Sequence, residues 1–198
     1  MDIQFFIELF CGGLTRGSIY ALIALGYTLV YGIIGLINFA HGEVYMLGSF
    51  TALLIAGALG VYGFPAGGIL IVAALAAIVW CSAYGYTLEK VAYKPLRGAP
   101  RLSPLISAIG MSIFLQNYVL LAQTSDFVPF PNLLPEMDFL EHIDYVMGAS
   151  DFLILLVSTI AMVSLSVFIR YTRMGKAMRA TAQNRKMALL LGINADRI

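Results

Sequence analysis

The sequence predicts an all-α, polytopic helical membrane protein in which about five helices cross the bilayer. Two features of composition lead to this prediction: 60% of the residues are hydrophobic and only 12% are charged, whereas soluble domains carry about a quarter charged residues. The third observation is a pattern, because apolar residues gather in runs of about 20, the length that a helix needs to cross the hydrocarbon core. We therefore expect lipid to replace water over most of the surface.

Five runs that lack Asp, Glu, Lys and Arg qualify, or nearly qualify, as membrane spans. They are expected near residues 17–37, 44–64, 66–88, 102–122 and 152–169. Glycines interrupt the second run, so a broken or tilted helix is expected there. The apolar stretch 3–15 is too short to span, and its phenylalanines share one helical face with Leu9, which predicts a short helix lying at the membrane interface.

The distribution of basic residues predicts the orientation. All of the 12 Lys and Arg residues except Arg16 lie in segments 89–101 and 170–198, and the positive-inside rule places such segments in the cytoplasm. The intervening loop 123–151 is acidic and contains no basic residue, so we expect it outside. Counting back places the N-terminus outside, where Arg16 can snorkel to the headgroups. The predicted organisation is a transmembrane region over residues 1–169 and a cytoplasmic segment over 170–198.

Five is an unusual number of spans for a complete transporter, and the sequence stops in mid-pattern at Ile198. We therefore expect the chain to be the N-terminal part of a longer protein. Cys11 and Cys81 lie in apolar surroundings without metal-ligand spacing, and we interpret both as small buried residues.

Polar residues in or beside the spans are the candidates for function, because lipid cannot satisfy them. Asn38, His41 and Glu43 lie between the first two apolar runs. We expect them at the cytoplasmic end of the second span, where an amide can cap a helix and a carboxylate favours its N-terminus. A capping and gating role is therefore predicted for them, in preference to direct contact with a substrate.

Three further residues are candidates for a pathway or gate. Gln116 and Asn117 lie in the most polar span, where amides face protein or a water-filled cavity, so they either line the pathway or bond to a neighbouring helix. Tyr27 belongs to a tyrosine stripe on the first span, which serves either packing or the pathway.

No catalytic motif stands out. There is no HExxH, GxSxG or P-loop pattern, and His41 with Glu43 would be a weak metal site, since His142 lies in the outer loop. Membrane topology explains the basic segments, so no nucleic acid is expected as a partner. We predict a protein without cofactor that is not an enzyme.

Three blocks of the sequence resemble one family. The block Leu22–Glu43, which ends in Ile-Asn-Phe-Ala-His-Gly-Glu, closely resembles the first-span signature of branched-chain amino acid permeases, the membrane subunits of bacterial ABC importers. Ser107–Asn117 looks like the fourth-span block of that family. Arg170–Ala180, continuing to Met187–Asn194, looks like its cytoplasmic coupling segment. Permeases of this family continue with further spans, which are absent here.

The resemblance implies a permease subunit of an ATP-driven importer of leucine, isoleucine and valine in the bacterial inner membrane. Its implied partners are a second homologous permease subunit, cytoplasmic ATPase subunits that hydrolyse the ATP, a periplasmic amino-acid-binding protein and membrane lipid. The implied coupling residues are Arg179, Ala180, Asn184, Ala188, Gly192 and Ile193, with Gly192 ending the helix as a C-cap. Apart from the resemblance, the same segment could lie on anionic lipid.

Three other functions remain open at this stage. One is an ABC permease for urea, a short amide or another small solute such as a sugar. Another is an ion-coupled secondary amino acid transporter, which would require an ionisable residue inside a span; none of the five runs contains one. The last is a membrane enzyme that uses His41 and Glu43 with a metal.

Overall fold

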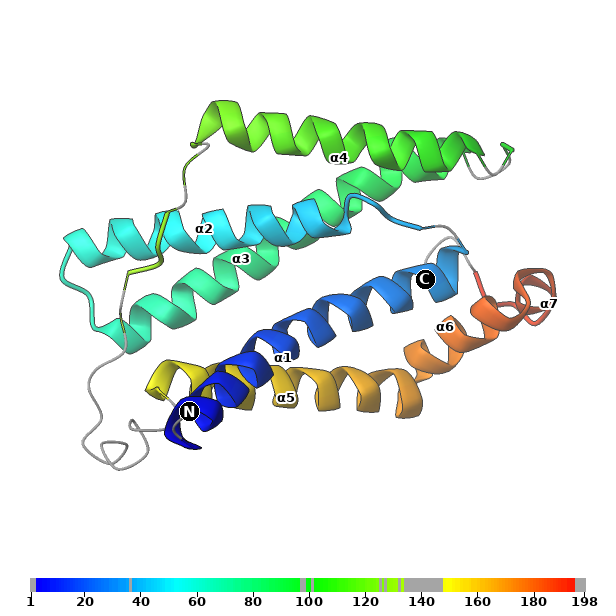
Figure 1. Cartoon of the computed structure of the whole chain (residues 1–198). Coiled ribbons are helices and arrows are strands. Elements are labelled where there is room, and N and C mark those ends of the chain that lie inside the picture. The colour runs from blue at the N-terminus through cyan, green and yellow to red at the C-terminus, as the bar shows by residue number, and fades with distance from the viewer. Residues whose placement is uncertain are drawn as a thin grey trace. The chain divides into compact units, whose positions relative to one another are not determined.

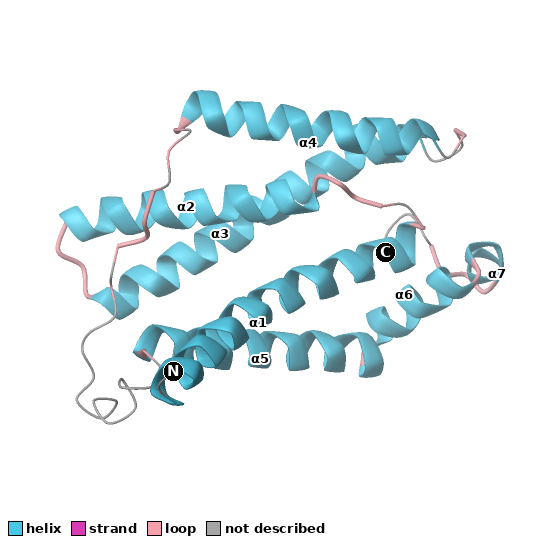
Figure 2. Cartoon of the chain, viewed as in Figure 1, coloured by secondary structure: helices cyan, strands magenta, loops and turns pink. Residues whose placement is uncertain are grey.

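The computed structural model consists of helices joined by loops (Figures 1 and 2). It describes residues 3–35, 37–96, 99–100, 102–124, 126, 128–131, 133 and 148–194. No strand occurs among these residues, and the predicted all-α class is confirmed.

The helices are α1 (Ile3–Ile34), α2 (His41–Val61), α3 (Ala66–Leu88), α4 (Leu102–Ala122), α5 (Ala149–Tyr171), α6 (Arg173–Gln183) and α7 (Arg185–Leu190). The first five are long and apolar enough to cross a membrane, which agrees with the predicted number of spans. The bounds of α3 and α4 are those expected from the sequence. The expected break in the second span is wrong, because α2 is continuous and glycine ends it only at Gly63, where φ is +70°.

The prediction of a separate interfacial helix before Gly17 is also wrong. α1 runs without a break through 32 residues, because no proline interrupts it. The Thr15 hydroxyl finds its acceptor in the Cys11 carbonyl of the same helix (3.1 Å). At 1.5 Å per residue α1 is about 48 Å long, and the hydrocarbon core is about 30 Å thick. The helix therefore tilts, or part of it extends beyond the core.

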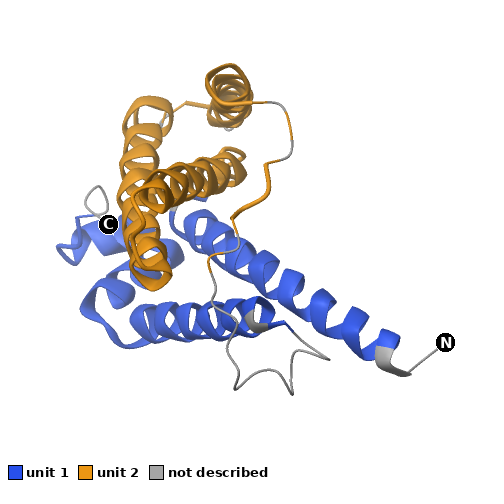
Figure 3. Cartoon of the chain, turned by 90° about the vertical axis from the view of Figure 1, so that its left-hand side faces the viewer, with its two compact units in different colours: residues 1–36, 136–198 blue, residues 37–135 orange. Residues whose placement is uncertain are grey.

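The chain divides into two compact units (Figure 3). Unit 1 comprises residues 1–36 and 136–198 and contains α1, α5, α6 and α7. Unit 2 comprises residues 37–135 and contains α2, α3 and α4.

In unit 1, α1 and α5 pack side by side and run in the same direction (Figure 1). α6 packs against both of them after a sharp corner at Thr172, whose hydroxyl oxygen accepts from the Gly175 N–H (3.0 Å) and caps α6. Only glycine fits at position 175, because a Cβ there would collide with the backbone carbonyl of Ile169. The direction of the chain after α5 is therefore fixed by close backbone packing.

In unit 2, α2 and α3 form an antiparallel hairpin, and α4 packs against α2 and against the continuation of α3. That continuation is a π turn over Glu89–Tyr93 followed by a 3₁₀ turn over Lys94–Leu96. The buried core joins all three helices through seven residues: Ala40, Leu47, Leu88, Tyr93, Ala108, Leu115 and Val119. The two helices of the hairpin pack tightly at Gly48, where an added Cβ would lie 2.6 Å from the Cys81 sulfur.

Several sequence predictions concern residues outside the described ranges. They include most of the acidic outer loop with His142, two of the basic residues of segment 89–101, and the last four residues of the chain.

We predict that Gly48→Ala weakens the α2–α3 hairpin through contact with Cys81. Overpacking costs about 1–3 kcal/mol, against a gain of about 1 kcal/mol from replacing a helical glycine with alanine. Cys81 cannot rotate away without losing its hydrogen bond to the Val44 carbonyl (3.4 Å). In a Cys81→Ala background the same change should be neutral or stabilising. Thermal unfolding of the four proteins of this double-mutant cycle measures the coupling, and equal effects of Gly48→Ala in both backgrounds would contradict the packing.

Candidate functional site

The Glu43 carboxylate, in the first turn of α2, is held by two polar side chains of α4. Its Oε1 accepts from the Ser112 hydroxyl (2.9 Å) and from the Gln116 amide (2.7 Å). Ser112 and Gln116 are one helical turn apart and so lie on the same face of α4. This three-residue group, which we call the Glu43 cluster, joins the start of α2 to α4.

The Glu43 cluster lies near the middle of α4. Ser112 and Gln116 are about 15 and 21 Å along this helix from Leu102, at 1.5 Å per residue, and the whole helix has 21 residues. Within unit 2, Glu43 itself lies in the first turn of α2, and its two partners lie in the interior of α4.

The spans also contain more charge than the sequence analysis assigned to them. α2 begins at His41 and so includes Glu43, and the continuous α1 includes Glu8 and Arg16. The expectation of spans without ionisable residues is wrong, because the apolar runs were shorter than the helices that contain them.

Hydrogen-bond donors face the Glu43 carboxylate. The N-terminus of α2 presents the positive end of its helix dipole to a carboxylate in the first turn, and both side-chain partners donate hydrogen bonds. Among the described residues, no hydrogen bond ends on Oε2 of Glu43. This second oxygen can therefore accept from a cationic or N–H-bearing solute.

Asn38 makes a second polar connection in unit 2. Its Oδ1 accepts from the Tyr93 hydroxyl (2.6 Å) and from the Ala40 N–H (3.1 Å). The predicted capping of α2 by Asn38 is not observed, because Ala40 occupies the N-cap position and has no side-chain cap. Asn38 instead ties the extended segment before α2 to the π turn after α3. The hydroxyl of Ser107 on α4 donates to the Ala92 carbonyl of the same turn (3.2 Å).

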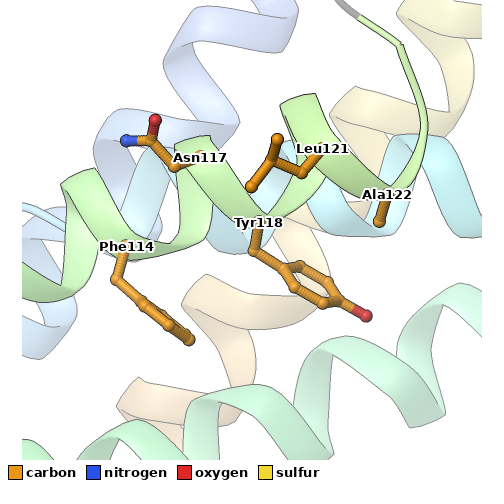
Figure 4. A pocket seen from close by; sticks show the side chains of 5 residues that line it. All are labelled: Phe114, Asn117, Tyr118, Leu121 and Ala122. Carbon is orange, nitrogen blue, oxygen red and sulfur yellow. The ribbon is translucent and has the colours of Figure 1, made fainter.

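His41 and Asn117 have different surroundings in the structure. His41 is half-buried at the first position of α2, and its backbone N–H donates to the Asn38 carbonyl (3.2 Å). Asn117 is exposed and donates to the Ile113 carbonyl of its own helix (2.8 Å). It lines an open pocket of about 440 Å³ along α4 with Phe114, Tyr118, Leu121 and Ala122 (Figure 4). Of the two predicted amides, Gln116 bonds to another helix and Asn117 faces open space.

The remaining candidates belong to unit 1. Tyr27 is half-buried on α1. Asn184 caps α7, since its Oδ1 accepts from the Met187 N–H (3.1 Å). Gly192 ends α7 as predicted, with φ of +79°, and the N–H groups of Gly192 and Ile193 donate to the carbonyls of Leu189 and Ala188 (3.1 and 3.0 Å). This pair of bonds is a Schellman motif.

The side chains of the α6–α7 segment do not all face outward. Ala188 is 1% exposed, Ala180 is half-buried, and Arg179 donates to the Arg170 carbonyl at the end of α5 (3.1 Å). The most exposed apolar side chains of this segment are Leu190, at the end of α7, and its C-cap neighbour Leu191, which are 80% and 77% exposed. Sequence reasoning missed Leu190 as a surface residue, because periodicity in a six-residue helix cannot say which face is covered.

Tyr93 is a site residue that sequence analysis did not find, and it carried no distinguishing signal in the sequence. As for metals, no group of three His, Cys, Asp or Glu side chains that could hold an ion occurs within the described part of the chain.

Comparisons with known proteins agree over nearly the whole sequence. Residues 9–198 match the family model described as branched-chain amino acid transport system / permease component. The chain is 50% identical over 198 residues to LivH, a high-affinity branched-chain amino acid transport system permease protein, from Escherichia coli strain K12 and at the same level to LivH from Salmonella typhimurium. It is 48% identical over 208 residues to the corresponding protein BraD of Pseudomonas aeruginosa.

These alignments cover 98% to 100% of this chain. The chain spans 64% of the length of the LivH proteins and 66% of that of BraD. No solved structure matches the chain.

We predict that Glu43→Ala destabilises the protein by about 1–3 kcal/mol, because it leaves the donors of Ser112 and Gln116 without an acceptor. Glu43→Gln keeps one acceptor oxygen and should cost less. Asn117→Ala is the matched control, since it removes an amide that bonds only within its own helix, and it should change stability by less than about 0.5 kcal/mol. Thermal unfolding of the intact protein in detergent measures all three, and a Glu43→Ala effect no larger than the control would exclude a structural role for the cluster.

Proposed function

This chain belongs to the family of branched-chain amino acid transport permeases, and we propose that it forms part of a permease subunit that imports leucine, isoleucine and valine at the expense of ATP. The observation that carries the proposal is the 50% identity to LivH across 98% of the chain. The structure supports the proposal with five helices that are long and apolar enough to cross a membrane. On this proposal the protein is an inner-membrane transport subunit, and ATP is hydrolysed on a separate chain.

Orientation forms part of the proposal. α1 and α5 run in the same direction within unit 1 (Figure 1), so their N-terminal ends lie at one face of the membrane. The basic α6–α7 segment follows the other end of α5, and the positive-inside rule assigns it to the cytoplasm. The starts of α1 and α5 then lie on the periplasmic side, where a binding protein would deliver its amino acid.

The α6–α7 segment is the proposed contact with the ATPase subunits. α7 presents Leu190 and Leu191 to the outside on a short, capped helix, and an apolar helix face of this kind fits a hydrophobic groove on a partner. The predicted coupling residues then act indirectly. Asn184 and Gly192 fix the two ends of α7, Ala188 packs beneath it, and the Arg179 bond to the Arg170 carbonyl ties the segment to α5.

The Glu43 cluster is the proposed polar part of the pathway in this chain. It places a carboxyl side chain beside the interior of α4, and ionisable side chains within membrane spans usually have a function. A free amino acid carries an ammonium group, and Oε2 of Glu43 can accept a brief hydrogen bond from it. A second permease subunit would complete the pathway.

Reconstitution tests the proposed function. The intact protein would be placed in proteoliposomes with its partner permease and ATPase subunits, and uptake of radiolabelled leucine would be measured with binding protein outside and ATP inside. We expect uptake that requires all of these components. Equal uptake without ATP under a proton or sodium gradient would identify a secondary transporter, and uptake of urea or a short amide in place of leucine would reassign the solute.

We predict that Leu190→Asp and Leu191→Asp each lower ATP-driven uptake by about tenfold or more while leaving the subunit folded. Both side chains are exposed, so the substitutions cost little stability, but a charge in an apolar groove is costly. Gln183→Asp adds the same charge at an exposed position of the same segment and should retain coupling. Copurification of the ATPase, measured beside uptake, identifies the defect, and normal ATPase binding with either leucine variant would contradict docking through α7.

A further inference from the structure

Unit 1 contains a pocket whose three charged residues the proposed function does not use. It has a volume of about 350 Å³ and lies between α1 and the first turn of α5. α1 contributes Phe5, Glu8, Leu9, Gly12, Gly13 and Arg16, and α5 contributes Asp151. The volume lies within the range of small-molecule sites, about 300–1,000 Å³.

The charges of this pocket do not neutralise one another directly. Within the described part of the chain, no hydrogen bond or ion pair ties Glu8, Arg16 or Asp151 to another residue. Ionisable groups in or beside a membrane span are rare and often mark the path of a solute. Glu8 and Arg16 are exposed and Asp151 is half-buried, so the charges around this pocket are available to a bound molecule.

The position of the pocket along the helices makes it accessible from water. Arg16 is about 27 Å from the end of α1 at Ile34, and Asp151 is about 30 Å from the end of α5 at Tyr171. These lengths are close to the thickness of the hydrocarbon core. If the α6 ends of both helices lie at the cytoplasmic interface, the pocket lies at the opposite interface.

The walls of the pocket are apolar beside its charges. Phe5 and Leu9 expose more than half of their side-chain surface. At Gly12 and Gly13 an added Cβ would meet no atom within 4 Å, so the glycine surface of α1 is open here. The pocket therefore combines a guanidinium, two carboxylates and an apolar wall, and in the proposed orientation it is open to the periplasmic side.

We propose that this pocket is an entry site for a zwitterionic, apolar α-amino acid. The Arg16 guanidinium, a planar fork of donors suited to carboxylates, receives the α-carboxylate. Asp151 and Glu8 accept from the α-ammonium group, and the side chain of the amino acid packs against Phe5 and Leu9. The inference rests on the proposed function, because it assigns to unit 1 the first contact of the solute after its release from a binding protein.

Photo-crosslinking tests the site directly. The probe is photo-leucine, whose side chain carries a diazirine, applied to the outer side of proteoliposomes that contain the intact transporter. We expect labelled peptides from residues 5–16 or from the first turn of α5, and we expect free leucine to compete with labelling. Leucinamide lacks the carboxylate and N-acetyl-leucine lacks the ammonium group, so each should compete at least about tenfold less well than leucine.

Variants test the role of each charge. Arg16→Gln and Asp151→Asn should each reduce labelling about tenfold or more, and Arg16→Lys should restore part of it by restoring the charge. Lys94→Gln is the control, because it removes an exposed cation from unit 2, which contributes no residue to the pocket, and its labelling should equal that of the wild type. The competition experiment on the wild-type protein remains decisive if a variant fails to fold.

The outcomes separate the two proposals. ATP-driven leucine uptake without labelling of the pocket would overturn the entry site and leave the proposed function intact. Absence of leucine uptake under every condition would overturn the proposed function itself. Labelling that excess leucine does not reduce, or that leucinamide reduces as well as leucine does, would show that the pocket does not recognise the zwitterion and would overturn the inference.

Discussion

The structure of unit 2 depends on one constraint, which is that polar groups shielded from water must find partners within the protein. The Glu43 carboxylate meets it through Ser112 and Gln116, and Asn38 meets it through Tyr93. Apolar helices gain little from packing against one another in lipid, so such bonds and the close approach of small residues hold them together. The Glu43 cluster joins α2 to α4, the Asn38 bond joins the start of α2 to the turn after α3, and Gly48 brings the α2–α3 hairpin into contact.

The sequence was sufficient to predict the helices but not their polar partners. α3 and α4 begin and end where their apolar runs do, because loops that contain proline separate them. α1 was misjudged because its apolar run was counted only from Gly17, after the charged Arg16, whereas the helix continues through Arg16. The pairing of Glu43 with Gln116 joins residues far apart in sequence, and helical periodicity carries no information about such contacts.

In the proposed coupling segment, too, the features set by local sequence could be predicted and those set by distant contacts could not. The cap at Gly192 could be predicted, because a glycine after a short apolar helix favours the left-handed conformation that a Schellman motif needs. The burial of Ala188 and the exposure of Leu190 could not be predicted, because they depend on how α7 folds back on unit 1. Asn184 and Gly192, which belong to the proposed coupling residues, thus set the two ends of α7. The side chains best placed to touch a partner are the neighbouring Leu190 and Leu191.

In unit 1, packed helices connect the proposed entry pocket to the proposed contact with the ATPase. α6 joins α5 at a corner set by the close backbone approach at Gly175 and by the Arg179 bond to the Arg170 carbonyl, and it also packs against α1. Movement of α7 by an ATPase would therefore be transmitted to α1 and α5 together rather than absorbed at a flexible joint. The same two helices line the proposed entry pocket, which lies about 27–30 Å along them from their cytoplasmic ends in the proposed orientation. Packed helices can carry coupling between two sites, and α5 connects the proposed pocket to the corner with α6 within one unit.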